Sequence, residues 1–218
     1  MSFAGIDCSE FPGLDMLAVI KGQTNVTWLG YYLDAPSHPN SGWCGQRGAL
    51  DILGFGLAPI FVGQEVIGPG SHVVSGQQGT ADGLQAASEM ADEGFAPSTC
   101  VFLDIENGGP ISAAQMSYIA SWTATVRREG YSAGLYCSHT DAAFLAAAHP
   151  LARIWAWNLG VNGNGGVAAP LPTPDVSACG YARASIWQRA QNVTLLPYGL
   201  QVDLDVATTA DPGAPLDA

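Results

Sequence analysis

The feature of this sequence that most limits its fold is a regular alternation of short apolar runs with helix-like runs. Five strand-like runs lie at residues 5–9, 28–34, 57–64, 100–106 and 131–138. Each is followed by a run of helical character, at residues 15–22, 43–55, 79–94, 112–130 and 141–148. Three further strand-like runs follow, separated by loops rich in Gly, Asn and Pro, at residues 153–159, 184–190 and 200–207. This order predicts a parallel sheet built from βα units.

The number of strands then selects the architecture. Eight parallel strands can close into a barrel that its own side chains fill. An open doubly wound sheet is less favoured, because "GIDCSEFPG" at the first strand lacks the G-x-G-x-x-G phosphate turn. We predict an α/β fold: a single TIM-like (β/α) barrel over residues 1–209, with eight strands and helices mainly after the first five. Residues 210–218 are expected to form a loose tail.

Composition and charge exclude several function classes. Hydrophobic residues make up 48% and charged residues 12%, which is typical of a compact globular chain. The net charge of −12, with one lysine and six arginines, argues against nucleic acid as a partner. No apolar run approaches the roughly 18 residues of a membrane span. The start, "MSFAGIDCSEFPG", lacks the features of a signal peptide, and the five cysteines lack metal-ligand spacing. The oligomeric state stays open.

Carboxylates stand at the ends of three predicted strands. In "VFLDIENG", Asp104 and Glu106 are two residues apart and therefore share a strand face. Asp7 ends the first strand, and Asp203 and Asp205 lie on the last. We expect four of these acids, Asp7, Asp104, Glu106 and Asp203, to meet at the carboxyl-end mouth of the barrel. Crowding there raises the pKa of at least one of them, as a general acid requires. Two alternatives are turn capping and a divalent cation held by oxygen ligands.

Aromatic and amide side chains also fall near predicted strand ends. Sugar rings stack on aromatic faces, and their hydroxyls pair with planar amides. The candidates for such contacts are Tyr32, Gln64, Tyr136, Trp157 and Gln188. For a tryptophan, core packing is the competing interpretation. No histidine pairs with a Ser or Cys in a nucleophile-elbow motif, so acyl transfer has no support.

Five segments resemble, in the same order, glycoside hydrolase family 25, the lysozymes that cut peptidoglycan. They are "GIDCSEFPG", "FLDIE", "AGLYCS", "IWQRA" and "VDLDV". The sequence is equally similar to a sister group of glycoside-hydrolase-like barrel domains in actinobacterial secreted and phage proteins. The resemblance to family 25 implies a barrel with five helices and bare final strands.

The resemblance implies roles for the acids. Glu106 would protonate the glycosidic oxygen, Asp104 would orient the substrate's N-acetyl group or steady the developing positive charge, and Asp7 and Asp203 would tune Glu106. Hydrolysis would be substrate-assisted or would invert through a water, and neither route needs a cofactor.

The expected function is hydrolysis of N-acetylmuramoyl glycans in bacterial cell-wall polysaccharide, by a protein that is secreted or delivered by a phage. A non-catalytic glycan-binding or structural barrel, for instance in a phage particle, is the main alternative. A metal-dependent hydrolase is a weaker one.

Overall fold

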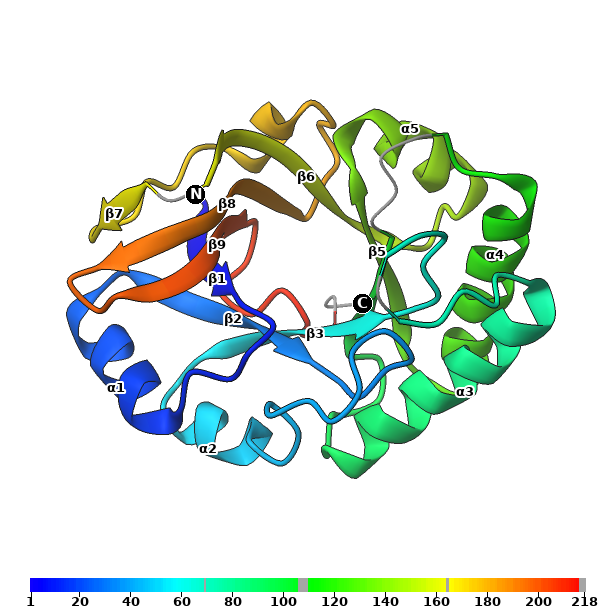
Figure 1. Cartoon of the computed structure of the whole chain (residues 1–218), viewed down its shortest axis with the longest axis horizontal. Coiled ribbons are helices and arrows are strands. Elements are labelled where there is room, and N and C mark those ends of the chain that lie inside the picture. The colour runs from blue at the N-terminus through cyan, green and yellow to red at the C-terminus, as the bar shows by residue number, and fades with distance from the viewer. Residues whose placement is uncertain (69, 106–109, 164, 216–218) are drawn as a thin grey trace.

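The computed structural model describes residues 1–68, 70–105, 110–163 and 165–215 and shows a closed eight-stranded barrel (Figure 1). Its strands are β1 (Phe3–Asp7), β2 (Val26–Tyr32), β3 (Gly56–Val62), β4 (Cys100–Asp104), β5 (Ser132–Ser138), β6 (Arg153–Asn162), β8 (Ile186–Leu196) and β9 (Leu200–Ala207). Neighbouring strands pair in that order, and the pairings of β6 with β8 and of β9 with β1 close the ring. The predicted TIM-like α/β barrel is confirmed.

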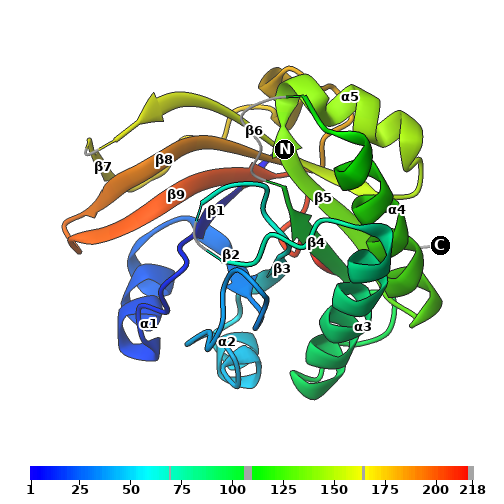
Figure 2. The ribbon, with the colours of Figure 1, turned by 45° about the vertical axis from the view of Figure 1, so that its right-hand side comes forward.

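Five helices cover one half of the barrel (Figures 1 and 2). They are α1 (Leu14–Gln23), α2 (Arg47–Ile52), α3 (Gly76–Asp92), α4 (Ala113–Arg128) and α5 (His139–Ala148), and each follows one of the first five strands. Ser112 caps α4 in a capping box with Gln115. Helix α3 begins at Gly76 rather than at the predicted residue 79, because the Ser75 side chain caps it by accepting from the backbone N–H of Gln78. Within the described residues, no helix has the length and apolarity needed to cross a bilayer.

The last strand runs in the opposite direction to the predicted one. Strand β9 is antiparallel to both β8 and β1. Only residues 197–199 join β8 to β9, and a parallel connection needs a crossover of a dozen residues or more. The reversal places Asp203 opposite Asp7, near the carboxyl ends of the parallel strands. It places Asp205 opposite Gly5, one layer deeper.

Two segments expected to be irregular are ordered parts of the fold. A short strand, β7 (Gly166–Ala168), lies in the Gly- and Asn-rich loop and extends the sheet along β8. Residues 210–215 are not a loose tail, and that prediction is wrong for them. The Arg153 guanidinium donates to the carbonyls of Pro212 (2.8 Å) and Ala214 (2.7 Å), and the Cys100 N–H donates to the Gly213 carbonyl (2.8 Å). The end of the chain therefore packs across the N-terminal ends of the strands.

Aromatic side chains fill the lower barrel. The Trp155 ring makes edge contacts with Trp28 and Phe102, at centroid distances of 5.6 and 5.5 Å. Glycines make room for these rings, since a Cβ on Gly5 would lie 2.1 Å from the Trp28 indole and one on Gly134 would lie 2.3 Å from the Phe102 ring. The interior is closed below this layer, so open space remains at the carboxyl ends of the strands.

Candidate active site

A cavity of about 680 Å³ opens at the carboxyl ends of the first four strands and is bordered by the β8–β9 hairpin. A small recess leads from it toward Trp155. Asp7, Asp104 and Asp203 line both the cavity and the recess, so the structure brings together three of the four predicted catalytic carboxylates. The fourth, Glu106, lies outside the described residues.

Asp7 forms the buried floor of the site. Its side chain ends β1 and is 5% exposed, and the Tyr32 hydroxyl donates to its Oδ1 at 2.6 Å. Burial raises the pKa of Asp7, although hydrogen bonds from Asp205 and Tyr32 partly offset the rise. Burial beside Asp7 also holds the pKa of Tyr32 well above its usual value, so the phenol remains a donor.

Asp205 lies one layer below and is a functional candidate that was not among the four predicted catalytic acids. It is 2% exposed, and the Trp155 indole N–H donates to its Oδ1 at 3.1 Å. Burial next to Asp7 and Asp203 raises the pKa of Asp205 well above its usual range. A raised pKa is expected for neighbouring buried carboxyl groups, because they cannot both ionise easily. The D-x-D spacing on β9 was the available sequence signal.

Asp203 is oriented by a chain of hydrogen bonds that crosses the barrel. The Gln188 amide donates to Asp203 Oδ2 and accepts from the Tyr136 hydroxyl, and the Asn192 N–H donates to Asp203 Oδ1 at 2.8 Å. Gln188 is 1% exposed and lies behind the cavity lining. The structure therefore places Gln188 where it orients Asp203 rather than where it would contact a sugar. Tyr32 and Tyr136 line the recess, and their sugar contacts remain a prediction.

Gln64, a predicted sugar-binding residue, belongs to a buried network outside the cavity. Its amide donates to Asp82 Oδ2 at 2.9 Å and accepts from the Val73 N–H at 3.0 Å. Asp82, 2% exposed on α3, also accepts from Tyr118 at 2.6 Å and from Gln78 at 2.7 Å. A buried carboxylate needs hydrogen-bond donors. Because the Gln64 amide is one of the donors to Asp82, its side chain is not part of the lining of the mouth cavity. The substrate-binding prediction for Gln64 is wrong.

Trp157, the other predicted sugar contact, is half-buried on β6 and is not part of the lining of this cavity. Its backbone carbonyl lies 3.3 Å from the His139 ring nitrogen. A stacking role for Trp157 remains a prediction.

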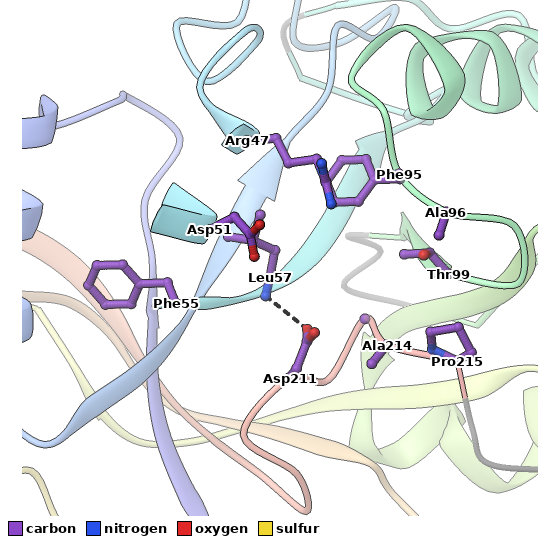
Figure 3. A pocket seen from close by; sticks show the side chains of 11 residues that line it. Arg47, Asp51, Phe55, Leu57, Phe95, Ala96, Thr99, Asp211, Ala214 and Pro215 are labelled. Carbon is purple, nitrogen blue, oxygen red and sulfur yellow. Dashed lines mark hydrogen bonds between the residues drawn. The ribbon is translucent and has the colours of Figure 1, made fainter. Parts of the chain in front are cut away.

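A second cavity, of about 170 Å³, lies at the opposite end of the barrel (Figure 3). The Asp211 carboxylate accepts from the Leu57 N–H at 3.0 Å, and the Arg47 guanidinium lies over the Phe95 ring at 5.2 Å. The Asp211 contact, with the bond from the Cys100 N–H to the Gly213 carbonyl, holds residues 211–213 against the first residues of β3 and β4. Because chemistry in barrels of this type collects at the carboxyl ends, this cavity is a packing feature and the mouth is the candidate site.

Among the described residues, side chains spaced to share a metal ion are found at Asp34, Cys44 and Glu89, none of which lines the mouth cavity. The mouth carboxylates themselves are arranged around open space, with two phenols beside them. An α/β barrel with acids gathered at the carboxyl ends of its strands is the architecture of a glycoside hydrolase-like protein.

The sequence places the chain in a particular family of that class. Residues 21–207 match the Rv2525c-like, glycoside hydrolase-like domain, and the chain belongs to this family. No curated protein matches the sequence significantly.

Solved structures share the fold at low identity. The Mycobacterium tuberculosis Tat-secreted protein Rv2525c, in complex with HEPES, superposes with a TM-score of 0.64 at 14% identity, covering 97% of each chain. The Clostridium perfringens spore cortex lytic enzyme SleM gives 0.61 at 13%, covering 94% of this chain and 67% of that one. The Streptococcus pneumoniae autolysin LytC, in complex with a synthetic peptidoglycan ligand, superposes with a TM-score of 0.56 at 13% identity. The match covers 94% of this chain and 46% of LytC. Identities of this size show the fold alone.

Proposed function

We propose that this protein hydrolyses N-acetylmuramoyl glycans of bacterial cell walls by lysozyme-type chemistry. The observation that carries the proposal is the meeting of Asp7, Asp104 and Asp203 around one cavity at the carboxyl ends of the strands. A volume of about 680 Å³ suits a saccharide-sized ligand. The names of SleM, a lytic enzyme, and of LytC, an autolysin bound to a peptidoglycan ligand, support the same substrate class.

The chain supplies both parts that glycoside hydrolysis needs, a proton donor and negative charge beside the forming cation. Glu106 follows Asp104 by two residues and is proposed as the acid that protonates the glycosidic oxygen. Asp104 and Asp203 lie where they can face the reacting sugar and stabilise an oxocarbenium-like charge or orient its acetamido group. Burial raises the pKa of both Asp7 and Asp205, and a proton on this pair would limit the negative charge below them.

The proposed place of action is outside the cell, after secretion or delivery by a phage. The substrate lies there, and the family includes a structure described as a Tat-secreted protein. The acidity of the chain, at −12, makes nucleic acid an improbable partner and is compatible with a carbohydrate ligand.

The test is digestion of purified peptidoglycan, followed by mass spectrometry of the released fragments, which reports both cleavage and bond type. Glu106→Gln and Asp104→Asn should each lower the rate by about 10²–10⁴-fold, the usual contribution of acid–base groups. Asp51→Asn, which removes a carboxylate at the opposite end of the barrel, should retain activity. Full activity in Glu106→Gln would remove the mechanism. Tight glycan binding without new reducing ends would instead favour the non-catalytic barrel.

A further inference from the structure

The mouth cavity carries more negative charge than the proposed chemistry uses. Besides the three carboxylates of the recess, Glu10 and Glu65 line the wider cavity without reaching the recess. Glu10 is exposed and Glu65 is half-buried, so both stand toward the rim. They are placed to face sugars that flank the reacting one.

No positive charge balances these five carboxylates within the described lining of the cavity. The lining contains no Lys or Arg, and its one histidine, His38, has a pKa that burial lowers, which keeps the ring neutral near pH 7. The carboxylates of the cavity also act on the Cys8 thiol. Burial, together with the negative charges of Asp7, Asp203 and Glu10, raises the pKa of this thiol to about 12.

The cations of the chain gather at the other end of the barrel. Of its seven basic residues, Lys21 binds the Gly54 carbonyl before β3, Arg47 lines the lower cavity, and Arg153 holds the C-terminal segment. Arg127 and Arg128 end α4, just before β5, and Arg183 precedes β8. The seventh, Arg189, lies within β8 and is not part of the cavity lining. The lining of the mouth cavity therefore carries carboxylates without a Lys or Arg to neutralise them, and such a negative field attracts cationic ligands to the mouth.

We propose that the cavity selects glycans that carry free amino groups, that is, partly de-N-acetylated amino-sugar polymers, with Glu10 and Glu65 facing the ammonium groups of the flanking sugars. This inference rests on the proposed function and names its substrate class. Ammonium groups pair with rim carboxylates, whereas the carboxylates of an unmodified cell wall meet like charge there.

The test uses one batch of de-N-acetylated peptidoglycan, half of it re-acetylated with acetic anhydride, so that the two substrates differ in their amines. Binding is measured by co-sedimentation of the full chain and cleavage by reducing-end release. At low salt, the amine-bearing form should bind and be cleaved better by about tenfold. At about 1 M salt, where the Debye length is near 3 Å, the two forms should converge. Glu10→Gln with Glu65→Gln should bring the ratio between substrates close to one, and Asp51→Asn should keep the wild-type ratio.

The outcomes separate this inference from the proposed function. Cleavage of both substrates at equal rates, or preference for the re-acetylated one, overturns the amine selectivity and leaves hydrolysis standing. Tighter binding of the amine-bearing form without cleavage supports the selectivity and removes the hydrolase. Absence of both binding and cleavage overturns both.

Discussion

The buried pair of Asp7 and Asp205 makes a prediction that can be worked out in energy. Asp205→Asn keeps an acceptor for the Trp155 indole, which donates at 3.1 Å, and offers an N–H donor to Asp7. Asp205→Ala removes both and leaves a buried indole N–H without its acceptor, a loss of about 1–3 kcal/mol for each unsatisfied group. At pH 4 we expect the free energy of unfolding to change by less than about 1 kcal/mol in the Asn variant and to fall by about 2–5 kcal/mol in the Ala variant.

The pH dependence follows from the direction of the pKa change. Because the pKa of Asp205 is raised on folding, the folded state binds its proton more tightly than the unfolded state. The stability that this group contributes is complete below its unfolded pKa of about 3.9 and is lost as the pH rises through the folded value, at about 1.4 kcal/mol per unit of difference. The Asn variant has no proton to lose at this position, so from pH 4 to pH 8 it should become more stable relative to the wild type.

Urea unfolding at pH 4, 6 and 8, followed by the fluorescence of the six tryptophans, measures this difference. Parallel curves for wild type and Asp205→Asn across that range would show that Asp205 does not hold the proton. An Ala variant as stable as the Asn variant at pH 4 would show that the Trp155 contact contributes nothing.

Three further predictions concern single contacts. Asp82→Ala leaves three donors without their acceptor and should cost about 3–5 kcal/mol, a fall of roughly 6–20 °C in Tm by calorimetry, whereas Asp82→Asn should cost less. Tyr32→Phe removes a hydrogen bond that lowers the pKa of Asp7, so any limb of the activity–pH profile set by that acid should move to higher pH; an unmoved profile would exclude Asp7 from it. Arg153→Ala removes two hydrogen bonds to the C-terminal segment and should cost about 2–4 kcal/mol, with faster proteolysis of that segment as the readout.

The barrel could be predicted from the sequence because its signal is periodic and repeated along the chain. Each strand needs an apolar face toward the interior, and each helix needs an apolar stripe toward the sheet. The alternation of strands and helices is therefore visible in the sequence as a change in the period of its apolar residues. The direction of β9 was harder to predict, because the alternation of apolar and polar residues is the same in a parallel and in an antiparallel strand. The short connection at residues 197–199 was the local sign of a hairpin, and the expectation of a parallel sheet outweighed it.

The positions of Asp7, Asp104 and Asp203 at the mouth could be predicted, because the end of a strand alone determines where each of these side chains lies. The site was not predictable where a distant partner decides which way a side chain turns. Gln64 follows β3 and could face the mouth, but Asp82, eighteen residues later on α3, takes its amide. The raised pKa of Asp205 could not be recognised because it comes from burial in the assembled barrel beside Asp7, which belongs to β1.

The reversed last strand gives the acids of the mouth a graded environment. In β9, Asp203 comes first and stays half-buried at the mouth, while Asp205 follows two residues deeper and is 2% exposed. A parallel β9 would exchange the two layers and move Asp205 away from the Trp155 indole that fixes it. Acids at different depths have different proton affinities, because desolvation raises the pKa more with burial. The direction of the hairpin therefore sets Asp205 at the depth where burial beside Asp7 raises its pKa, and leaves Asp203 at the cavity.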